Sequence, residues 1–243
     1  MLLAAALSGA AVGAGGGGIA QASTSQDPDP PWSMTSLGVS AQGQPLIAYQ
    51  RSKAIATRHI AVFGVIHGDE LAGRAVTDAL LSVPLPANLA LTIVPTMNPD
   101  GERLSQRGNA NQVDLNRNFP FGWLPAGASE YTVGGYYPGT GPLSEPEAQG
   151  VHEWIARLRP NFAIWYHQPW GTVVCNDGSG WECPSFAAAV GMPAEYAPRP
   201  GSAADWASAT GTPAAVVELP EVGLTAEGVA AHVAAILNLY AGA

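Results

Sequence analysis

Three short apolar runs of the chain each end on a side chain that can bind a metal ion or move a proton. The runs are rich in valine, isoleucine or aromatic residues, which predicts buried strands. The runs and the residues that follow them are Ile60 to Ile66 with His67, Asn161 to Tyr166 with His167, and Ala214 to Val217 with Glu218. Ligands bind at the carboxyl ends of the strands in an open α/β sheet, so this pattern predicts one site formed by the three strand ends.

Segments with helical periodicity alternate with these runs. Strands alternating with helices predict a single α/β domain over residues 33–243, with a mixed, mainly parallel central sheet sandwiched between helices. Ser144 is the expected N-cap of the second helix. The expected helices are Glu70 to Leu81, Glu145 to Leu158, Ala203 to Ala209 and Thr225 to Tyr240; the other expected elements are a strand or hairpin over Leu37 to Arg51, a strand over Leu89 to Val94 and a short segment over Phe186 to Val190.

The segment from Asn98 to Gly141 is rich in glycine, asparagine and proline and has little periodicity. A loop of this length inside a compact domain is usually functional. It contains Asn116 and Arg117 side by side, with Arg107 close upstream. A planar guanidinium binds two carboxylate oxygens at once and an amide adds a donor, so the pair suits a carboxylate clamp. The alternative for either arginine is a surface or structural ion pair.

The pair His67 and Glu70 offers an imidazole nitrogen and a carboxylate oxygen just before a helix. This pair suits a divalent metal, with zinc as the first choice, but a third ligand has to come from elsewhere. A single His-x-x-Glu pair is also common by chance, with only a structural or surface role. The metal interpretation is supported by the ends of the other two predicted strands, which also carry suitable side chains.

Composition limits the partners of the 243-residue chain. Charged residues make up 12%, hydrophobic residues 47%, and the net charge is −9 with Lys53 as the only lysine. This balance predicts a folded chain and argues against a nucleic-acid partner or binding to an anionic membrane surface.

The amino-terminal sequence predicts export. Residues 1–22 are mostly apolar and small and end on Ala20-Gln-Ala22, which is typical of a signal peptide, although the usual positive charge is missing. Residues 23–32 form a Pro-rich linker. The alternative is an uncleaved membrane anchor. In an exported protein Cys175 and Cys183 favour a disulfide, and in a reducing compartment they would be free thiols.

The motifs resemble, in their order along the chain, those of the zinc carboxypeptidase family. They are His67-x-x-Glu70, Asn98-Pro-Asp-Gly101, Arg107, Asp114-x-Asn-Arg-Asn118, His167 and Glu218-Leu219. The short chain, the sequence Leu115-Asn-Arg-Asn-Phe-Pro120 and the ending Glu218-Leu-Pro220 are most similar to the bacterial murein peptide amidase branch.

The resemblance implies a role for each residue of the site. One zinc ion per chain would be held by two histidines and a glutamate, a second glutamate would be the general base, and the arginines would contact the substrate. By residue, the implied roles are His67, Glu70 and His167 for zinc, Glu218 as base, Arg107 to polarise the scissile carbonyl, Asn116 and Arg117 to hold a carboxylate, and Tyr196 to cap the substrate. Tyr196 has the alternative of a partly exposed loop tyrosine, and the interval from Ser202 to Asp205 is one residue longer than usual in the family.

The resulting expectation is an exported, monomeric zinc peptidase or amidase that cleaves an amide bond next to a free carboxylate. The expected substrate is a peptidoglycan stem peptide, cut at a γ-D-glutamyl-diaminopimelate bond. The alternatives are a general metallocarboxypeptidase, a deacylase of small N-acyl amino acids, and an inactive zinc-binding domain that recognises peptides. A phosphate-binding glycine loop and a Gly-x-Ser-x-Gly motif are both missing from the sequence, which disfavours phosphotransfer and serine hydrolysis.

Other polar residues fit the site less well. His59 starts a strand, at the wrong end for the site, and His152 and His232 fall on helix faces where solvated or capping roles are expected. Asp69 and Glu221 are neighbours of site residues, and they are expected to be either hydrogen-bonding partners of the ligands or plain surface charges.

Overall fold

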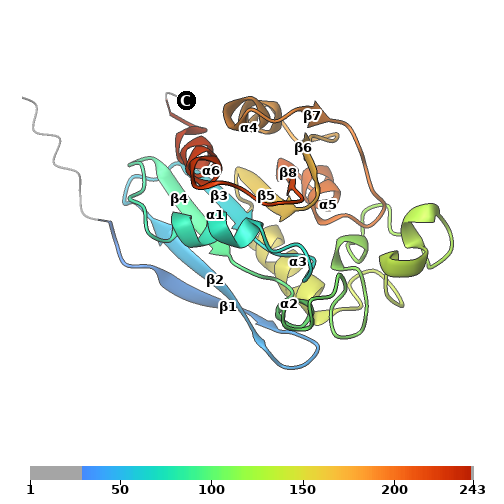
Figure 1. Cartoon of the computed structure of the whole chain (residues 1–243). Coiled ribbons are helices and arrows are strands. Elements are labelled where there is room, and N and C mark those ends of the chain that lie inside the picture. The colour runs from blue at the N-terminus through green and yellow to red at the C-terminus, as the bar shows by residue number, and fades with distance from the viewer. Residues whose placement is uncertain (1–28, 242–243) are drawn as a thin grey trace, which may run out of the picture.

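The computed structural model describes residues 29–241 and is built on one eight-stranded sheet (Figure 1). The predicted signal peptide and most of the predicted linker lie outside the described residues. None of the helices in the described part of the chain combines the length and the apolarity needed to cross a bilayer.

The sheet is mixed, with parallel pairing at its centre, and runs in the order β1-β2-β4-β3-β5-β8-β6-β7. The neighbours β4, β3, β5 and β8 are parallel, β6 and β7 are parallel, and the pairs β1/β2, β2/β4 and β6/β8 are antiparallel. The strands are β1 Ser33–Val39, β2 Pro45–Ser52, β3 Arg58–Phe63, β4 Leu89–Val94, β5 Phe162–His167, β6 Trp170–Val174, β7 Ala194–Glu195 and β8 Ala214–Pro220.

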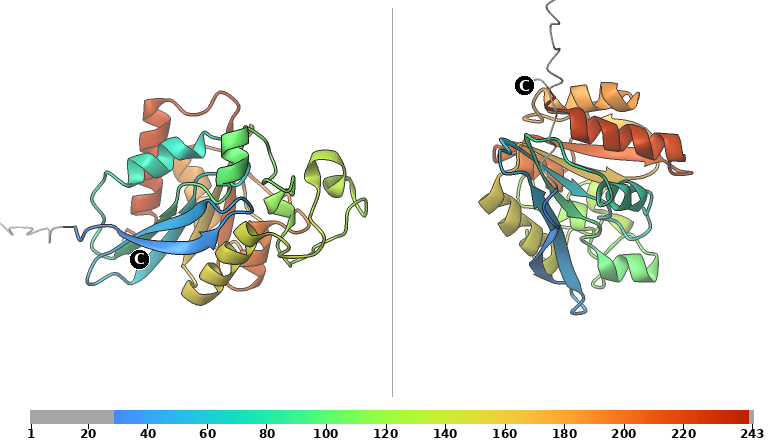
Figure 2. Two further views of the ribbon diagram at one scale, coloured as in Figure 1. Left: turned by 90° about the horizontal axis from the view of Figure 1, so that it is seen from below. Right: turned by 90° about the vertical axis from the view of Figure 1, so that its left-hand side faces the viewer.

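Helices cover both faces of the sheet, as the two views in Figure 2 show. The helices α3 and α5 pack on one face, around Phe63 and Trp165, while α1, α4 and α6 pack on the other, around Val62 and Ile164. The predicted α/β sandwich is therefore confirmed. The helices are α1 Gly73–Leu80, α2 Pro99–Leu104, α3 Pro146–Leu158, α4 Glu182–Val190, α5 Ala203–Ala209 and α6 Ala226–Asn238, with single 3-10 turns η1 Leu115–Arg117, η2 Glu130–Thr132 and η3 Gly134–Tyr136.

Several predicted boundaries were wrong because residues next to the site leave regular structure. The strand β3 ends at Phe63 instead of Ile66, and α1 begins at Gly73 instead of Glu70. The intervening residues form the turn that carries His67 and Glu70. Ser144 does not cap α3 either, since Glu145 is the N-cap and the Ser144 hydroxyl donates a hydrogen bond to the Glu145 carboxylate.

Apart from the 3-10 turns, three elements have no counterpart among the predictions. The six-residue helix α2 and the strands β6 and β7 lie in segments without clear periodicity. The predicted short segment at Phe186 is the second half of α4.

The predicted disulfide is present. Cys175 and Cys183 are joined at an S–S distance of 2.00 Å. The bond links the residue after β6 to the first turn of α4, and it closes the loop that carries Asn176 and Asp177 beside the site described below. This loop is therefore tied to the α4 side of the sheet.

The prediction of a solvated His232 was wrong. Its side chain is 2% exposed, and a hydrogen bond of 3.0 Å joins its Nδ1 atom to the buried Tyr166 hydroxyl. Helix α6 packs against α1 and α4 as well as the sheet, which buries a face that a helix lying alone on the sheet would expose.

Candidate active site

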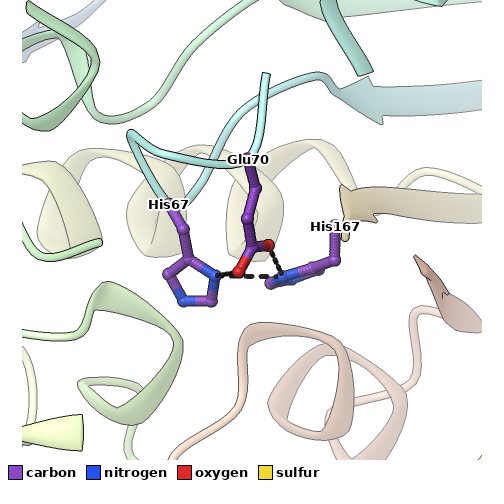
Figure 3. Close-up of side chains that lie close together, drawn as sticks. All are labelled: His67, Glu70 and His167. Carbon is purple, nitrogen blue, oxygen red and sulfur yellow. Dashed lines mark hydrogen bonds and ion pairs between the residues drawn. The ribbon is translucent and has the colours of Figure 1, made fainter. Parts of the chain in front are cut away.

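Three side chains converge at the carboxyl ends of β3 and β5 (Figure 3). The Nδ1 atom of His67 lies 3.0 Å from Glu70 Oε1, and the Nδ1 atom of His167 lies 3.0 Å from Glu70 Oε2. The two Nδ1 atoms are 3.1 Å apart. All three residues are buried, so their nitrogen and oxygen atoms face one another with little competition from water.

The sheet brings these residues together. His167 is the last residue of β5, and β5 runs parallel to β3, whose end leads into the turn that carries the other two residues. A Cβ atom at Gly68, between His67 and Glu70, would lie 1.9 Å from the carbonyl carbon of Gly101. Glycine at this position therefore allows the turn to pack directly against α2.

Asp114 holds His67 in position. Its Oδ1 atom accepts a 2.9 Å hydrogen bond from His67 Nε2, and its Oδ2 atom accepts one of 3.0 Å from Arg107 Nε. Because Nε2 donates to Asp114, Nδ1 is the ring nitrogen of His67 that faces Glu70 and His167. Burial alone would raise the pKa of Asp114, but His67 and Arg107 hold it well below its usual range.

The ionisation of the three clustered residues suits metal binding. Burial lowers the pKa of His167 to about 4, so its imidazole is neutral near pH 7. Burial also acts to lower the pKa of His67, but Asp114 and Glu70 outweigh it and raise that pKa. The histidines oppose the effect of burial on Glu70, whose pKa lies below its usual range. A cation bound here would displace a proton from His67.

The donor set fits a zinc ion. Two imidazole nitrogens and one carboxylate oxygen lie within 4.8 Å of one another in a buried group that could hold a metal ion. Three protein ligands of these types leave a fourth position open, as in catalytic zinc sites.

Glu218 lines the same cavity as the three clustered residues. The cavity has a volume of about 240 Å³. In the sheet Glu218 is paired with His167 on the neighbouring strand, and its buried Oε2 atom has no hydrogen-bond partner among the described residues. Burial, and then the nearby Glu70, raise the pKa of Glu218 to about 8. A buried carboxyl group without a partner needs a function or a ligand to explain it.

Arg107 is part of the same group of charges. Its Nη1 atom donates a 2.8 Å hydrogen bond to Glu70 Oε1, in addition to the bond from Nε to Asp114. Burial would lower the pKa of Arg107, but Asp114 and Glu70 raise it, so the guanidinium stays charged. The ion pairs considered from the sequence are therefore formed, and both partners belong to the site.

Asn116 and Arg117 also line the cavity. Arg117 is 4% exposed, and its Nε and Nη1 atoms donate to the main-chain carbonyls of Tyr131 and Asn116, at 3.0 and 2.7 Å. Asn116 accepts a hydrogen bond from the Ala203 amide. Gly201 has a φ of +71°, and a Cβ atom there would lie 2.2 Å from the Arg117 carbonyl oxygen, so glycine lets this loop pack on η1.

Tyr196 does not lie with the other predicted residues. Its side chain is 62% exposed, and its hydroxyl donates a 2.9 Å hydrogen bond to Asp177. It lines a neighbouring cavity of about 250 Å³ that also contains Phe121 and Asp205. The role of Tyr196 in substrate binding stays a prediction. Asp69 and Glu221 are exposed side chains, which favours the surface-charge interpretation.

Sequence reasoning missed three of the residues at the site, Asp114, Tyr131 and Arg199. Asp114 stands in the quoted motif, two residues before Asn116, and this spacing is the signal that could have identified it. Arg199 lines the cavity together with Tyr131, but no motif marks either residue. Their position depends on how two long loops pack together.

Comparisons with known proteins agree with this geometry. The profile of the zinc carboxypeptidase family matches residues 24–174, more than half of the chain. The chain belongs to the zinc carboxypeptidase family. It is therefore a metallopeptidase, a hydrolase of peptide bonds. The predicted resemblance is confirmed, although Glu218 lies beyond the matched residues.

Several proteins of known name are similar to this chain in sequence, in structure or in both. Murein peptide amidase A of Vibrio campbellii is 32% identical over 201 residues, which cover 77% of this chain and 79% of the relative. The Escherichia coli K12 protein of the same name is 33% identical over 142 residues, which cover 54% of this chain and 57% of that protein. The crystal structure of murein-tripeptide amidase MpaA from E. coli O157 has a TM-score of 0.67 and 28% identity, and covers 86% of this chain and 92% of that one. Thrombin activatable fibrinolysis inhibitor, at 19% identity and a TM-score of 0.73 over 86% of this chain and 68% of its own, shares the fold.

Proposed function

We propose that this chain is an exported zinc amidase that hydrolyses the γ-D-glutamyl-diaminopimelate bond of peptidoglycan stem peptides, next to a free carboxylate. The observation that carries the proposal is the content of one cavity. It combines a group of metal-binding side chains, the unpartnered carboxyl group of Glu218 and the buried guanidinium of Arg117. Metal-assisted hydrolysis of an amide beside a carboxylate would use these three features together.

His67, Glu70 and His167 are the proposed ligands of one zinc ion per chain. When bound, zinc supplies a Lewis acid and lowers the pKa of a water molecule. The buried hydrogen bond from His67 to Asp114 keeps one ligand in the required tautomer. The low pKa of His167 keeps another ligand deprotonated near neutral pH.

Glu218 is the proposed general base. Its Oε2 atom has no protein partner, so it is free to accept a proton from the attacking water and later to give this proton to the leaving amine. A positive charge close to a carboxyl group lowers its pKa, which brings Glu218 from about 8 in the metal-free chain toward the ionised form that a base needs.

The arginines are proposed to bind the substrate. Arg107 lies beside Glu70 and would donate to the oxygen of the scissile carbonyl as negative charge develops there. Arg117 donates two hydrogen bonds to neutral carbonyl groups, which leaves its charge for a substrate carboxylate. Asn116 lies next to it and would add a neutral donor.

The relatives support the choice of substrate. Two of them are named murein peptide amidases, and the better covered one aligns with 77% of this chain. A general carboxypeptidase would need the same zinc ligands, so the geometry alone does not separate the two activities. An inactive binding domain would need neither Glu218 nor Arg107.

The experiment compares two substrates with the purified, zinc-loaded protein. The tripeptide L-Ala-γ-D-Glu-meso-diaminopimelate is expected to release free diaminopimelate, detected by mass spectrometry. A peptide with an ordinary α-linked carboxyl-terminal residue is expected to react at least about tenfold more slowly. Faster cleavage of the ordinary peptide would instead support a general carboxypeptidase, and no cleavage of either would contradict the amidase.

Export is proposed from the amino-terminal sequence and is consistent with the disulfide, since such bonds persist in oxidising compartments. The mature protein isolated from outside the cytoplasm is expected to begin at Ser23, as measured by intact mass. A mass that includes residues 1–22 would support the uncleaved anchor. Sedimentation of the purified chain tests the expected monomer.

A further inference from the structure

Three arginines line the cavity that contains Glu218, and their charges are balanced differently. Arg107 is paired with Glu70 and Asp114. In the described part of the chain, neither Arg117 nor Arg199 makes an ion pair with a carboxylate. The side chain of Arg199 donates a 3.1 Å hydrogen bond to the main-chain carbonyl of Pro198. Two guanidinium groups in one cavity are therefore left without a directly paired carboxylate.

Aromatic rings hold the guanidinium of Arg199 at the wall of the cavity. Its central carbon lies 4.4 Å from the ring centroid of Tyr131 and 5.7 Å from that of Trp170. Its backbone amide donates a 2.8 Å hydrogen bond to Asp205. A guanidinium that stacks on rings keeps its N–H edge available, and its fixed position reduces the entropy lost when a ligand binds.

Asp205 and Glu218 are acidic residues near Arg199, and the oxygens of Asp205 are used elsewhere. Oδ2 accepts the Arg199 main-chain amide, and Oδ1 accepts a hydrogen bond from the side chain of Asn176. Asp205 lines the neighbouring cavity rather than the one that contains Glu218. It therefore does not take the place of an anion bound to the Arg199 side chain.

The positive charge in this cavity contrasts with the acidic character of the whole chain. Its net charge is −9, yet the cavity gathers two arginines that have no acidic partner. The like charges also act on each other: burial is the main cause of the lowered pKa of Arg117, and the charges of Arg107 and Arg199 lower it further. A substrate with two negative groups would relieve this repulsion, whereas a substrate with one would leave one guanidinium unpaired.

We propose that Arg199 binds a second carboxylate of the substrate, in addition to the one held by Arg117, and so makes the enzyme selective for peptides with two acidic groups around the scissile bond. The inference rests on the proposed function. In the proposed substrate a second carboxylate has two sources: the α-carboxylate of the γ-linked glutamate and the distal carboxylate of diaminopimelate. Both offer the planar pair of oxygens that a guanidinium binds.

The test measures kcat and KM on three tripeptides: the L-Ala-γ-D-Glu-meso-diaminopimelate parent, the same peptide with the glutamyl α-carboxylate amidated, and the same peptide with lysine in place of diaminopimelate. The variant Arg199→Gln removes the charge, and Arg199→Lys keeps the charge without the planar pair of donors. Arg157→Gln is the matched control, because Arg157 is exposed on α3 and does not line the cavity.

Arg199→Gln is expected to raise the KM for the parent peptide about tenfold with a small change in kcat. The same substitution is expected to have a much smaller effect on whichever analogue lacks the carboxylate that Arg199 binds, which identifies the source. Arg199→Lys is expected to be intermediate and Arg157→Gln to match the wild type. An equal loss on all three peptides, or a loss accompanied by a lower melting temperature, would overturn the inference and indicate a structural role.

Binding without turnover separates this inference from the proposed function. Calorimetry with the parent peptide on a Glu218→Gln background is expected to show about tenfold weaker binding once Arg199→Gln is added. If the wild type cleaves none of the three peptides while this difference in binding remains, the proposed reaction fails and the second carboxylate site stands. If the wild type cleaves the parent and binding is unaffected by Arg199→Gln, the second site fails and the reaction stands.

Discussion

Asp114 and His67 share a hydrogen bond of 2.9 Å between side chains that are 0% and 1% exposed. The same aspartate accepts from Arg107 and from the main-chain amide of Asn116. One buried carboxylate thus positions a proposed zinc ligand, a proposed catalytic arginine and the start of the turn that carries the proposed carboxylate clamp. The geometry of the site depends on a residue that itself lies outside the cavity lining.

Asp114→Asn is expected to weaken zinc binding about tenfold to a hundredfold, because an amide orients the imidazole of His67 less firmly and makes it a weaker ligand. Competition with a chromophoric chelator measures the affinity. Asp69→Asn is the matched control, since Asp69 is exposed although it lies next to Glu70 in the sequence. Unchanged affinity in Asp114→Asn, with the native melting temperature retained, would contradict the positioning role.

Glu218→Gln is expected to keep zinc and lose turnover. The amide cannot accept the proton of the attacking water, so kcat should fall by roughly a factor of a thousand. Zinc content, measured by elemental analysis, should stay at the proposed one ion per chain, because Glu218 is not among the three clustered residues proposed as ligands. A variant that retains both zinc and full turnover would show that another group is the base.

Arg117→Gln is expected to remove the preference for a free carboxylate. Loss of one charge-assisted interaction corresponds to about 2 kcal/mol, or roughly a 30-fold lower kcat/KM. The tripeptide and its carboxyl-terminal amide provide the comparison, and the two should react at similar rates in the variant. Arg117 is not the carboxylate-binding residue if the variant still discriminates between the acid and the amide as the wild type does.

The sequence predicted the parts of the fold that are organised by burial. The runs that became β4, β5 and β8 are wholly or largely buried, and an apolar run is the direct consequence of burial on both faces of a sheet. The strand β6 escaped prediction because it begins at Trp170, which is 57% exposed at the rim of the cavity, and follows Pro169. Helix α2 did carry a signal, with Asn98 as N-cap and Pro99 at its start, but it is too short to show periodicity.

The residues of the site also divide into those that the sequence predicts and those that it does not. His67, Glu70, His167 and Glu218 come together because their strands are neighbours in a parallel sheet, and strand ends can be recognised in the sequence. Arg199 could not be predicted, because it reaches the cavity through stacking on Tyr131, a residue on a distant loop. Contacts between two irregular loops leave no periodic pattern.

The titration of His232 makes the stability of the fold depend on pH. Burial lowers its pKa from 6.5 to about 4, so the unfolded chain takes up a proton between these pH values and the native chain does not. Stability is therefore complete above about pH 6.5 and falls as the pH drops toward 4, by about 3 kcal/mol from this residue. His59 also reduces stability as the pH falls, because burial lowers its pKa to about 4 as well.

His232→Gln tests this contribution because glutamine is polar and does not titrate. The variant loses stability at pH 7 through the altered contact with Tyr166, but its unfolding free energy should fall less steeply between pH 6.5 and 4 than that of the wild type. Urea unfolding at several pH values, with zinc kept away by a chelator, gives the two slopes. Parallel slopes would mean that His232 is protonated in the native state over this range. A shallower slope in the variant would confirm that a buried, neutral histidine on α6 makes the fold sensitive to acid independently of the metal ligands.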